Sequence, residues 1–551
     1  MGGCLPFCPD YFIFFVDTRY VFCYNHTITA QRELHLVNLT NKSEVTRLRL
    51  MLHFPDVDRM PDHPALPVPP LHALNEQFRQ ALMNPQNKIL RRDEHGNPIF
   101  GAYIGSDSNE LITWAIITLG EWFSGRDASW LTSTFPTFFS EEAQVYMNGP
   151  HAVEIEFWYL FYVNTLCGAM QQVFFPQDEA VRRRFATSAD SLVRMAKALH
   201  YDFNQQSFHF LRMQPITHKP QYRQPDSIGG YAYNMLFAAL HADRPQCMEE
   251  SLHAIRLYEQ MPANPWYEIP NDSAALMAAA WLDAHGHPRD IARIAGWLFD
   301  HEHGPLQIGK WGNEEVDGLM MGWFGDTRAQ AMASAYSMET FMPIQFFLPA
   351  VRYCPQLADA VGKYIRCMLS NFQLFYARGS EPLYETKPEL DASIPYERLD
   401  FERDGHTPAA CGDFFGHRSI YGSGYLMWLE ALACATSNAD IFALDCSLTD
   451  WLADERYPVF LLRNPFGDAR TVTFSPAPIW QQLQPTLFRD GRLYAQQYNL
   501  ESRESCIADE HVICTIPAKS CLLVALLPEG KEPVVHGNML TCGQAELCRV
   551  L

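Results

Sequence analysis

Acidic and aromatic residues occur together in three loop-like segments of this 551-residue chain. In the clearest of them, Trp266 and Tyr267 stand directly before Glu268, and Pro270 follows. A carboxyl group can protonate a leaving oxygen or activate a water molecule, and aromatic faces stack on the C–H groups of sugars. Asn or Asp at the start of an apolar helix is also an ordinary N-cap. We predict that Glu268 is catalytic. The predicted substrate-binding residues of this loop are Trp266, Tyr267, Asn271 and Asp272.

The second segment covers residues 311–326 and places acids and aromatic rings among glycines. Glycine lets the backbone approach a ligand closely. A solvated acidic loop is the alternative, but such loops seldom carry two Trp and a Phe. We predict a catalytic acid here, with Asp317 preferred and Glu315 next. Trp311 and Trp323 are predicted to bind substrate.

The third segment lies in a stretch of about forty residues, 378–419, that has no clear secondary-structure pattern. Such stretches inside compact domains are usually functional or disordered, and the aromatic residues and His here argue against disorder. Asp404 or Asp413 is a candidate for the base that activates water. The alternative is a lid held by surface ion pairs. The predicted substrate-binding residues in and after this stretch are His406, Arg418 and Tyr421.

Two further groups of residues carry weaker signals. Glu154 and Glu156 stand at the start of a helix-like segment, where acids are common because of the helix dipole. The loop Arg212–Arg223 is basic in an acidic protein, so Arg223 is predicted to bind a carboxylate or phosphate of the substrate. A surface ion pair is an equally good interpretation of this loop.

Metal and cofactor motifs are missing from the sequence. Its short His pairs lack the spacing of zinc ligands. It contains neither Gly-x-Gly-x-x-Gly nor a phosphate-binding loop, and its Gly-Ser-Gly does not follow a strand as a nucleophile elbow does. We predict neither a metal nor a cofactor.

Composition excludes several classes of partner. A net charge of -21 argues against binding to nucleic acid or to an anionic membrane surface. No apolar run approaches the roughly 20 residues that span a bilayer. Fifteen dispersed cysteines are typical of free thiols in a reducing compartment, so we predict a cytoplasmic protein with a small-molecule or oligosaccharide substrate. No pattern indicates an oligomeric state.

The elements that must position these loops alternate in a regular way. Between helix-like segments, long loops alternate with very short links, for example near Asp243–Cys247, Gly286–His287 and Cys354–Pro355. Alternate connections of an antiparallel helix array lie at opposite ends, so the long loops should gather at one end. Amphipathic segments such as Asp178–Leu199 and Met248–Met261 should lie outside. Those apolar on every side should lie inside; they are Asp107–Ser124, Ala152–Phe175, Ser227–Ala242, Asp272–His285, Met338–Tyr353 and Ile420–Ser437.

Six inner and six outer helices in alternation resemble the (α/α)6 toroid of many carbohydrate-active enzymes. An α-solenoid is the alternative, but no sequence recurs at a fixed period. The resemblance implies a catalytic toroid over 71–454, after strands in 1–54 and a Pro-rich linker at 55–70. Strand-like residues 455–530 resemble the small antiparallel β-domain that often follows such toroids, and the tail 531–551 is predicted to be irregular.

The resemblance and the three loops together predict a glycoside hydrolase that acts on an oligosaccharide by carboxylate general acid–base catalysis, with inversion of configuration. Three alternatives stay open: a lyase acting on uronates, a toroid lyase or isomerase acting on an apolar alcohol, and a sugar-binding protein without activity.

Overall fold

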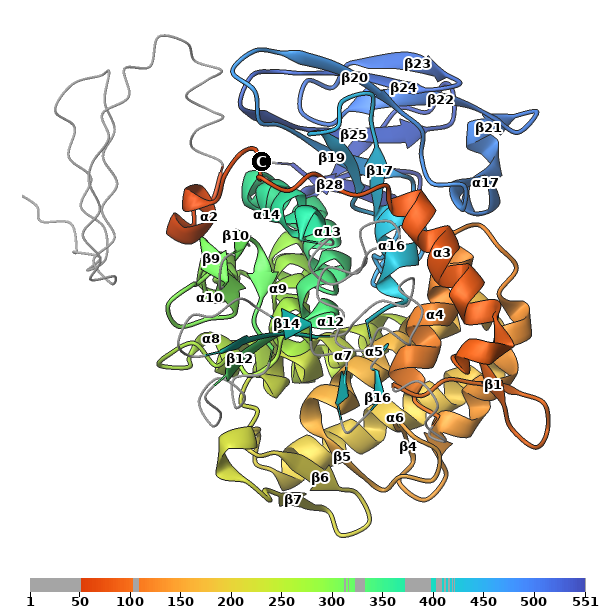
Figure 1. Cartoon of the computed structure of the whole chain (residues 1–551), viewed down its shortest axis with the longest axis vertical. Coiled ribbons are helices and arrows are strands. Elements are labelled where there is room, and N and C mark those ends of the chain that lie inside the picture. The colour runs from red at the N-terminus through yellow and green to blue at the C-terminus, as the bar shows by residue number, and fades with distance from the viewer. Residues whose placement is uncertain are drawn as a thin grey trace, which may run out of the picture. The chain divides into compact units, whose positions relative to one another are not determined.

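The computed structural model describes residues 51–550 except 103–108, 312–313, 316, 323–331, 372–397, 403–408, 411–412, 415–416, 419 and 421. The side chains of 311, 314–315, 332–336, 398–402, 409–410, 413–414 and 417–418 also lie outside the description. All described residues belong to one compact unit, 50–551 (Figure 1). The strands predicted before residue 51 lie outside it.

A closed circle of helix contacts forms the centre of this unit. Its members are α4 (Leu111–Phe123), α5 (Phe157–Phe174), α7 (Ser227–His241), α9 (Ile269–Ala284), α12 (Ser337–Phe341) continued by α13 (Ile344–Tyr353), and α16 (Tyr425–Leu432). Each contacts the next, and α16 contacts α4. Nearly all their residues are buried, which confirms the prediction that helices apolar on every side lie inside.

A second set of helices alternates with the first along the chain. It comprises α3 (Leu71–Met83), the 3-10 segment η2 (Ser129–Phe138), α6 (Glu179–Ala198), α8 (Cys247–Glu259), α10 (Ile291–Leu298) and α14 (Ala358–Ser370). The links 175–178, 242–246, 285–290 and 354–357 are short, whereas 199–226, 299–336 and 371–424 are long, as predicted. η2 contains Pro136, which breaks a regular helix and explains why this element has only a weak helical pattern in its sequence.

Close backbone approach joins α7 to α9. A Cβ atom on Gly230 would collide with Oδ1 of Asn271 and with Cβ of Phe161. We expect Gly230→Ala to lower the free energy of unfolding by about 1–3 kcal/mol, the usual cost of overpacking. Gly296 lies in α10 with nothing near its missing Cβ, so Gly296→Ala should stabilise the protein by up to about 1 kcal/mol. Urea denaturation of both variants measures the free energy of unfolding. Equal changes in the two variants would contradict the prediction.

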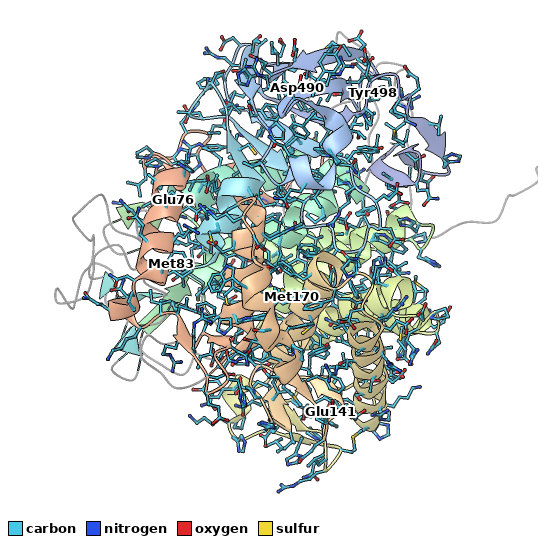
Figure 2. All side chains as sticks on the ribbon, turned by 90° about the vertical axis from the view of Figure 1, so that its right-hand side faces the viewer. Glu76, Met83, Glu141, Met170, Asp490 and Tyr498 are labelled. Atoms are coloured by element: carbon cyan, nitrogen blue, oxygen red, sulfur yellow. The ribbon has the colours of Figure 1, made fainter. Side chains whose placement is uncertain are left out.

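The C-terminal part is rich in strands, as predicted. One sheet has the order β17-β18-β19-β25-β22-β21, β23 pairs with β22, and β20 pairs with β24. The strands are β17 (Ala433–Ala435), β18 (Phe442–Asp445), β19 (Val459–Asn464), β20 (Arg470–Phe474), β21 (Phe488–Arg489), β22 (Arg492–Asn499), β23 (Ser505–Asp509), β24 (Val512–Ile516) and β25 (Ser520–Leu527). Figure 2 shows Asp490 and Tyr498 among these strands, Glu76 and Met83 along α3, and Met170 within the helical part.

Three details of the prediction were wrong. The last inner helix ends at Leu432 instead of Ser437, because the next residues pair with β18 as strand β17. The segment Pro485–Phe488, whose sequence pattern predicts a strand, instead contains a 3-10 turn over residues 485–487. The tail predicted to be irregular contains β26 (Val534–His536), β27 (Met539–Cys542) and β28 (Ala545–Arg549), which pair with one another, and β28 contacts α13.

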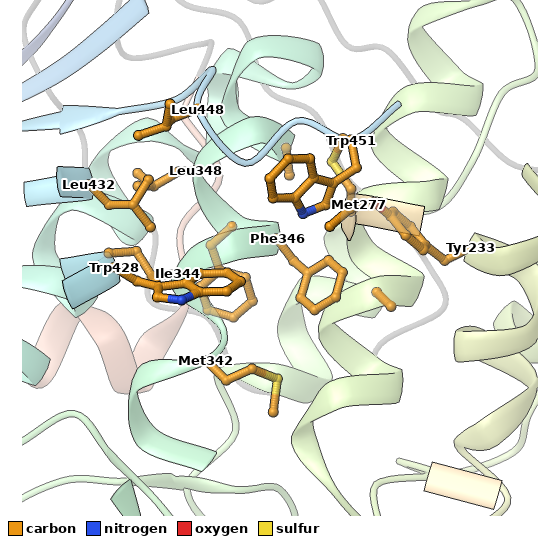
Figure 3. Packing of buried hydrophobic residues seen from close by; sticks show 14 of the residues in the cluster. Tyr233, Met277, Met342, Ile344, Phe346, Leu348, Trp428, Leu432, Leu448 and Trp451 are labelled. Carbon is orange, nitrogen blue, oxygen red and sulfur yellow. The ribbon is translucent and has the colours of Figure 1, made fainter. Parts of the chain in front are cut away.

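The segment after β18 covers one end of the circle of inner helices, the end at which the short links between helices lie. Figure 3 shows Trp451 among buried side chains of α7, α9 and α13, including Tyr233, Met277 and Phe346. A polar contact continues this layer, since the hydroxyl of Thr449 donates to the carbonyl of Gln345 at 3.0 Å. The helix starts at the other end are therefore the place to look for a site. Among the described residues, no helix combines the length and the apolar character needed to cross a membrane.

Candidate active site

Four buried carboxyl groups gather where inner helices begin. Asp226 precedes α7, Glu268 precedes α9, Asp272 lies in the first turn of α9, and Glu339 lies in α12. Their exposed fractions are 0%, 5%, 1% and 2%. Asp and Glu are almost never fully buried unless they are paired. A cluster of buried acids therefore needs an explanation for each member.

Two of these acids hold the start of α9. Oδ2 of Asp226 accepts hydrogen bonds from the backbone N–H groups of Glu268 at 2.9 Å and Tyr267 at 3.3 Å. Oε2 of Glu339 accepts one from the N–H of Ile269 at 3.1 Å. The first N–H groups of a helix have no partner within the helix, so carboxylates placed there cap it. Asp226 and Glu339 therefore join three helix starts.

The side chain of Glu268 lies in a different setting from those of these two acids. Within the described part of the chain, its Oε2 atom is buried and has no hydrogen-bond partner. Burial raises the pKa of Glu268 well above its usual value, and the negative charges of Glu339, Glu156 and Asp226 raise it further. The raised pKa favours the protonated form of the carboxyl group, which is the form that a general acid requires.

Asp226 and Asp272 differ in the direction they face. Both have one buried oxygen without a hydrogen-bond partner among the described residues. Burial raises the pKa of Asp226 to about 7. Burial, followed by the charge of Asp226, raises the pKa of Asp272. Asp272 accepts a hydrogen bond from the hydroxyl of Tyr258 in α8, so it faces an outer helix. Asp226 is the better candidate for a proton acceptor near neutral pH.

Gln224 connects this cluster to the start of α5. Its Oε1 accepts a hydrogen bond from the N–H of Trp158 at 2.8 Å, and its Nε2 donates one to Glu156 at 3.3 Å. Its side chain also hydrogen-bonds to Tyr267, next to Glu268. Burial raises the pKa of Glu156, which precedes α5. A fifth acid and two aromatic residues are thus fixed beside the four carboxyl groups.

Polar side chains also meet between the inner helices. The hydroxyls of Tyr162 in α5 and Tyr425 in α16 contact each other, and Nε2 of Gln345 in α13 donates to both, at 3.1 and 3.3 Å. In the described part, Oε1 of Gln345 and the hydroxyls of Ser337 and Ser423 are buried without partners. Buried polar atoms are usually hydrogen-bonded, so this group has free capacity for a water molecule or a ligand hydroxyl.

The residues predicted around Glu268 lie in several different settings. Trp266 and Tyr267 are buried in the loop before α9. Asn271 is also buried and donates to the Ser227 hydroxyl at 3.1 Å, which ties α9 to α7. Arg223 is exposed on the connection before α7. Their predicted roles in substrate binding remain predictions.

The described hydrogen bonds of Asp317 involve residues outside the carboxyl cluster. Its Oδ1 accepts a hydrogen bond from the N–H of Gly309 at 2.9 Å, and its carbonyl accepts one from Asn371 at 3.1 Å. Gly309 belongs to the same hairpin, made by β8 (Leu306–Gln307) and β11 (Leu319–Met320). Among the described residues, no hydrogen bond or ion pair joins Asp317 to Glu268. The described contacts of Asp317 hold the hairpin and tie it to Asn371 after α14, and its catalytic role stays a prediction.

The other predicted residues are described only in part. Trp311 lies in β9 (Lys310–Trp311) and Glu315 in β10 (Glu314–Glu315), which pair, and Arg418 lies in β16 (His417–Arg418), paired with β15 (Asp413–Phe414). The side chains of these strands lie outside the described residues. So do Trp323, Asp404, His406 and Tyr421, whose roles stay predictions.

Sequence reasoning missed Asp226 and Glu339 as members of the site. Both carried a signal that could have found them. Asp226 stands before an apolar helix as Glu268 does, and Glu339 is the one acid within Met338–Tyr353. A single acid in a helix that is buried on every side must be paired or functional. In the described part of the chain, no three His, Cys, Asp or Glu side chains are arranged to hold a metal ion.

The raised pKa values predict how stability depends on pH. Asp226, Glu268 and Asp272 hold protons in the folded state that the unfolded chain releases above about pH 4. Their contribution to stability is therefore complete below about pH 4 and is lost as the pH rises through their folded-state pKa values. We expect Glu268→Gln to remain folded and to exceed the wild type in stability by more than about 1 kcal/mol at pH 8, with a smaller difference at pH 5.

Thermal unfolding followed by circular dichroism at both pH values checks this result. Glu141→Gln removes an acid whose side chain is 70% exposed, and it should leave the pH dependence unchanged. A Glu268→Gln variant that is less stable than the wild type at pH 8 would show that the carboxylate supports the fold.

Comparisons with known proteins give structural matches only. No protein-family model matches the chain, and a search of the curated proteins finds no match. Among solved structures, the chain is similar to the cellobiose 2-epimerase from Bacillus thermoamylovorans B4167, with a TM-score of 0.42 and 9% identity, over 65% of this chain and 98% of that chain. A sugar epimerase from a ruminal bacterium has a TM-score of 0.41 and 11% identity, over 65% and 98%. The cellobiose 2-epimerase from Spirochaeta thermophila DSM 6192 has a TM-score of 0.39 and 11% identity, over 65% and 96%.

Proposed function

We propose that this protein is an enzyme that acts on a sugar through general acid–base catalysis by carboxyl groups, and that it is a glycoside hydrolase. The observation that carries the proposal is Glu268, a buried carboxyl group with a raised pKa whose Oε2 has no partner among the described residues. A carboxyl group whose pKa is raised by burial, and whose Oε2 atom has no partner among the described residues, suits the protonation of a glycosidic oxygen.

In the proposed reaction, Glu268 gives its proton to the glycosidic oxygen as the bond from that oxygen to the anomeric carbon breaks. Asp226 accepts a proton from a water molecule, whose oxygen forms the new bond to the anomeric carbon. The Oδ1 atom of Asp226 is available for this step, while Oδ2 is held by two backbone N–H groups. Asp404 stays a predicted alternative to Asp226 as the base.

The expected stereochemical outcome is inversion. It requires a separation of about 6.5–9.5 Å between the two carboxyl groups, which leaves room for the water molecule. Tyr267 and Trp266, next to the proposed acid, would supply aromatic faces for the sugar.

The architecture and location are part of the same proposal. The closed circle of inner helices, with an outer helix after each one, supports an (α/α)6 toroid over 71–454, followed by a β-domain over 455–530. The described cysteines are free thiols and nearly all are buried, which supports a cytoplasmic location.

The test is incubation of the purified protein with panels of oligosaccharides and uronides. Hydrolysis appears as new reducing ends, and proton NMR of the first product gives its anomeric configuration. A lyase would instead form an unsaturated uronide, which absorbs in the ultraviolet. The same samples are examined for epimerised but uncleaved sugar, the reaction named for the three similar structures. If no sugar is cleaved, changed or bound, the proposal fails.

A further inference from the structure

A groove of about 850 Å³ borders the same two helix starts that carry the proposed catalytic carboxyl groups. One wall comes from the connection before α7 and ends at Pro225, directly before Asp226. The opposite wall comes from the connection before α9 and includes Trp266, two residues before Glu268. Each connection therefore contributes several residues to the groove and an acid close by to the buried cluster.

Two tryptophans line this groove, and their positions are fixed. Nδ2 of Asn264 donates to the carbonyl of Trp297 at 2.9 Å, and its Oδ1 accepts a hydrogen bond from the N–H of Trp266 at 3.1 Å. The half-buried Trp297 ring also meets Tyr258 edge-on at 5.4 Å, and the Arg293 guanidinium lies over it at 4.9 Å. The orientation of Trp297 is thus set before any ligand binds, so ordering it costs little on binding.

The polar side chains that line the groove differ in whether they have hydrogen-bond partners among the described residues. Asp300 accepts hydrogen bonds from the N–H groups of Glu302 and His303, at 2.8 and 2.9 Å. Arg223 also lines the groove, and in the described part of the chain its guanidinium makes no hydrogen bond or ion pair. Its N–H groups remain available to a ligand that offers oxygen acceptors.

We propose that this groove binds further sugar units of an oligosaccharide whose reacting unit lies at the carboxyl cluster. A fixed tryptophan beside amide and guanidinium donors suits a sugar ring, which presents C–H groups on its face and hydroxyl groups around its edge. The proposal rests on the proposed function and extends it, because it predicts that the substrate is longer than a disaccharide.

The experiment measures binding by isothermal titration calorimetry. The protein carries Glu268→Gln, which keeps the ligands intact, and the ligands are α-1,4- and β-1,4-linked glucose oligosaccharides of two to six units. We expect affinity in one series to rise with length. Adding Trp297→Ala should weaken binding of the hexasaccharide at least tenfold more than binding of the disaccharide. Trp130→Ala changes another partly buried tryptophan, in η2, and should alter neither.

Because Arg223 is exposed, Arg223→Met gives a second variant that should fold, and it is expected to show the same preferential loss for the longer ligands. Equal loss for short and long ligands in both variants, no loss, or no binding of either series would overturn the proposal. If the wild type cleaves sugars while these variants bind long ligands normally, the groove proposal alone fails. If long ligands need Trp297 but the wild type changes no sugar, the hydrolase proposal alone fails.

Discussion

Replacement of Glu268 by glutamine is expected to lower kcat by about 10²- to 10⁴-fold, the usual contribution of a general acid. Glutamine keeps the shape of the side chain but cannot donate the proton that the leaving oxygen needs. The loss should appear in kcat more than in KM, because proton transfer belongs to the transition state. Initial rates on the best oligosaccharide of the substrate panel give both constants.

A substrate with a very good leaving group provides a sharper test of the role of Glu268. An aryl glycoside with an acidic phenol needs little protonation, so the variant should keep much more of its activity on this substrate than on the oligosaccharide. Glu141→Gln, an exposed acid of another connection, should behave as wild type on both. An equal loss on the two substrates would assign Glu268 a role other than proton donation.

For the same substitution, Glu268→Gln, stability and activity are expected to change in opposite directions. We expect Glu268→Gln to stabilise the protein at pH 8 while it removes activity. Burying a carboxyl group beside other acids costs folding free energy, and proteins keep such an arrangement where function requires it. A glutamate that only supported the fold would give loss of stability on substitution. The two results together therefore separate catalysis from structure.

The inner helices could be predicted because their sequences are unusual over their whole length. Residues 227–238 and 269–282 carry almost no charge, so only burial on every side suits them. The alternation of long and short connections then placed the loops at one end. Strand β17 could not be predicted in this way. Residues such as Ala433 and Ala435 favour a helix, but pairing with β18 overrides that local preference.

Of the four buried acids in the candidate site, Glu268 and Asp272 were singled out from the sequence, and Asp226 and Glu339 were missed for a physical reason. Glu268 stood out because no local motif explains a glutamate between Tyr267 and Pro270. Asp226 stands directly before α7, where an acid is an ordinary helix cap, but its side chain caps α9 and not its own helix. Only the fold brings these helix starts together. Asp317 stood out by its composition, yet its hydrogen bond to Gly309 is local.

The second large effect concerns the closed end of the helix circle, where Arg352 of α13 forms an ion pair with Asp450 at 2.5 Å. Both side chains are fully buried. The hydroxyl of Tyr353 also donates to Asp450, at 2.8 Å, and Nε of Arg352 donates to the carbonyl of Leu547 in β28 at 3.1 Å. Arg352 thus connects an inner helix to the C-terminal strands.

Arg352→Ala is expected to lower the free energy of unfolding by about 3–5 kcal/mol, because it removes the ion-pair partner of a fully buried carboxylate, that of Asp450. Guanidinium denaturation followed by tryptophan fluorescence measures the loss. Arg489→Ala, which breaks an ion pair exposed by 59% and 50%, should change stability by less than about 1 kcal/mol.

The double variant Arg352→Met with Asp450→Asn shows where this energy comes from. It removes both charges and keeps much of the side-chain volume, so no unpaired charge is left in the core. We expect it to be more stable than Arg352→Ala, even though it contains more changes. If the double variant is as unstable as the single one, the loss comes from packing and from the bonds to β28, and the charge of Asp450 has little part in it.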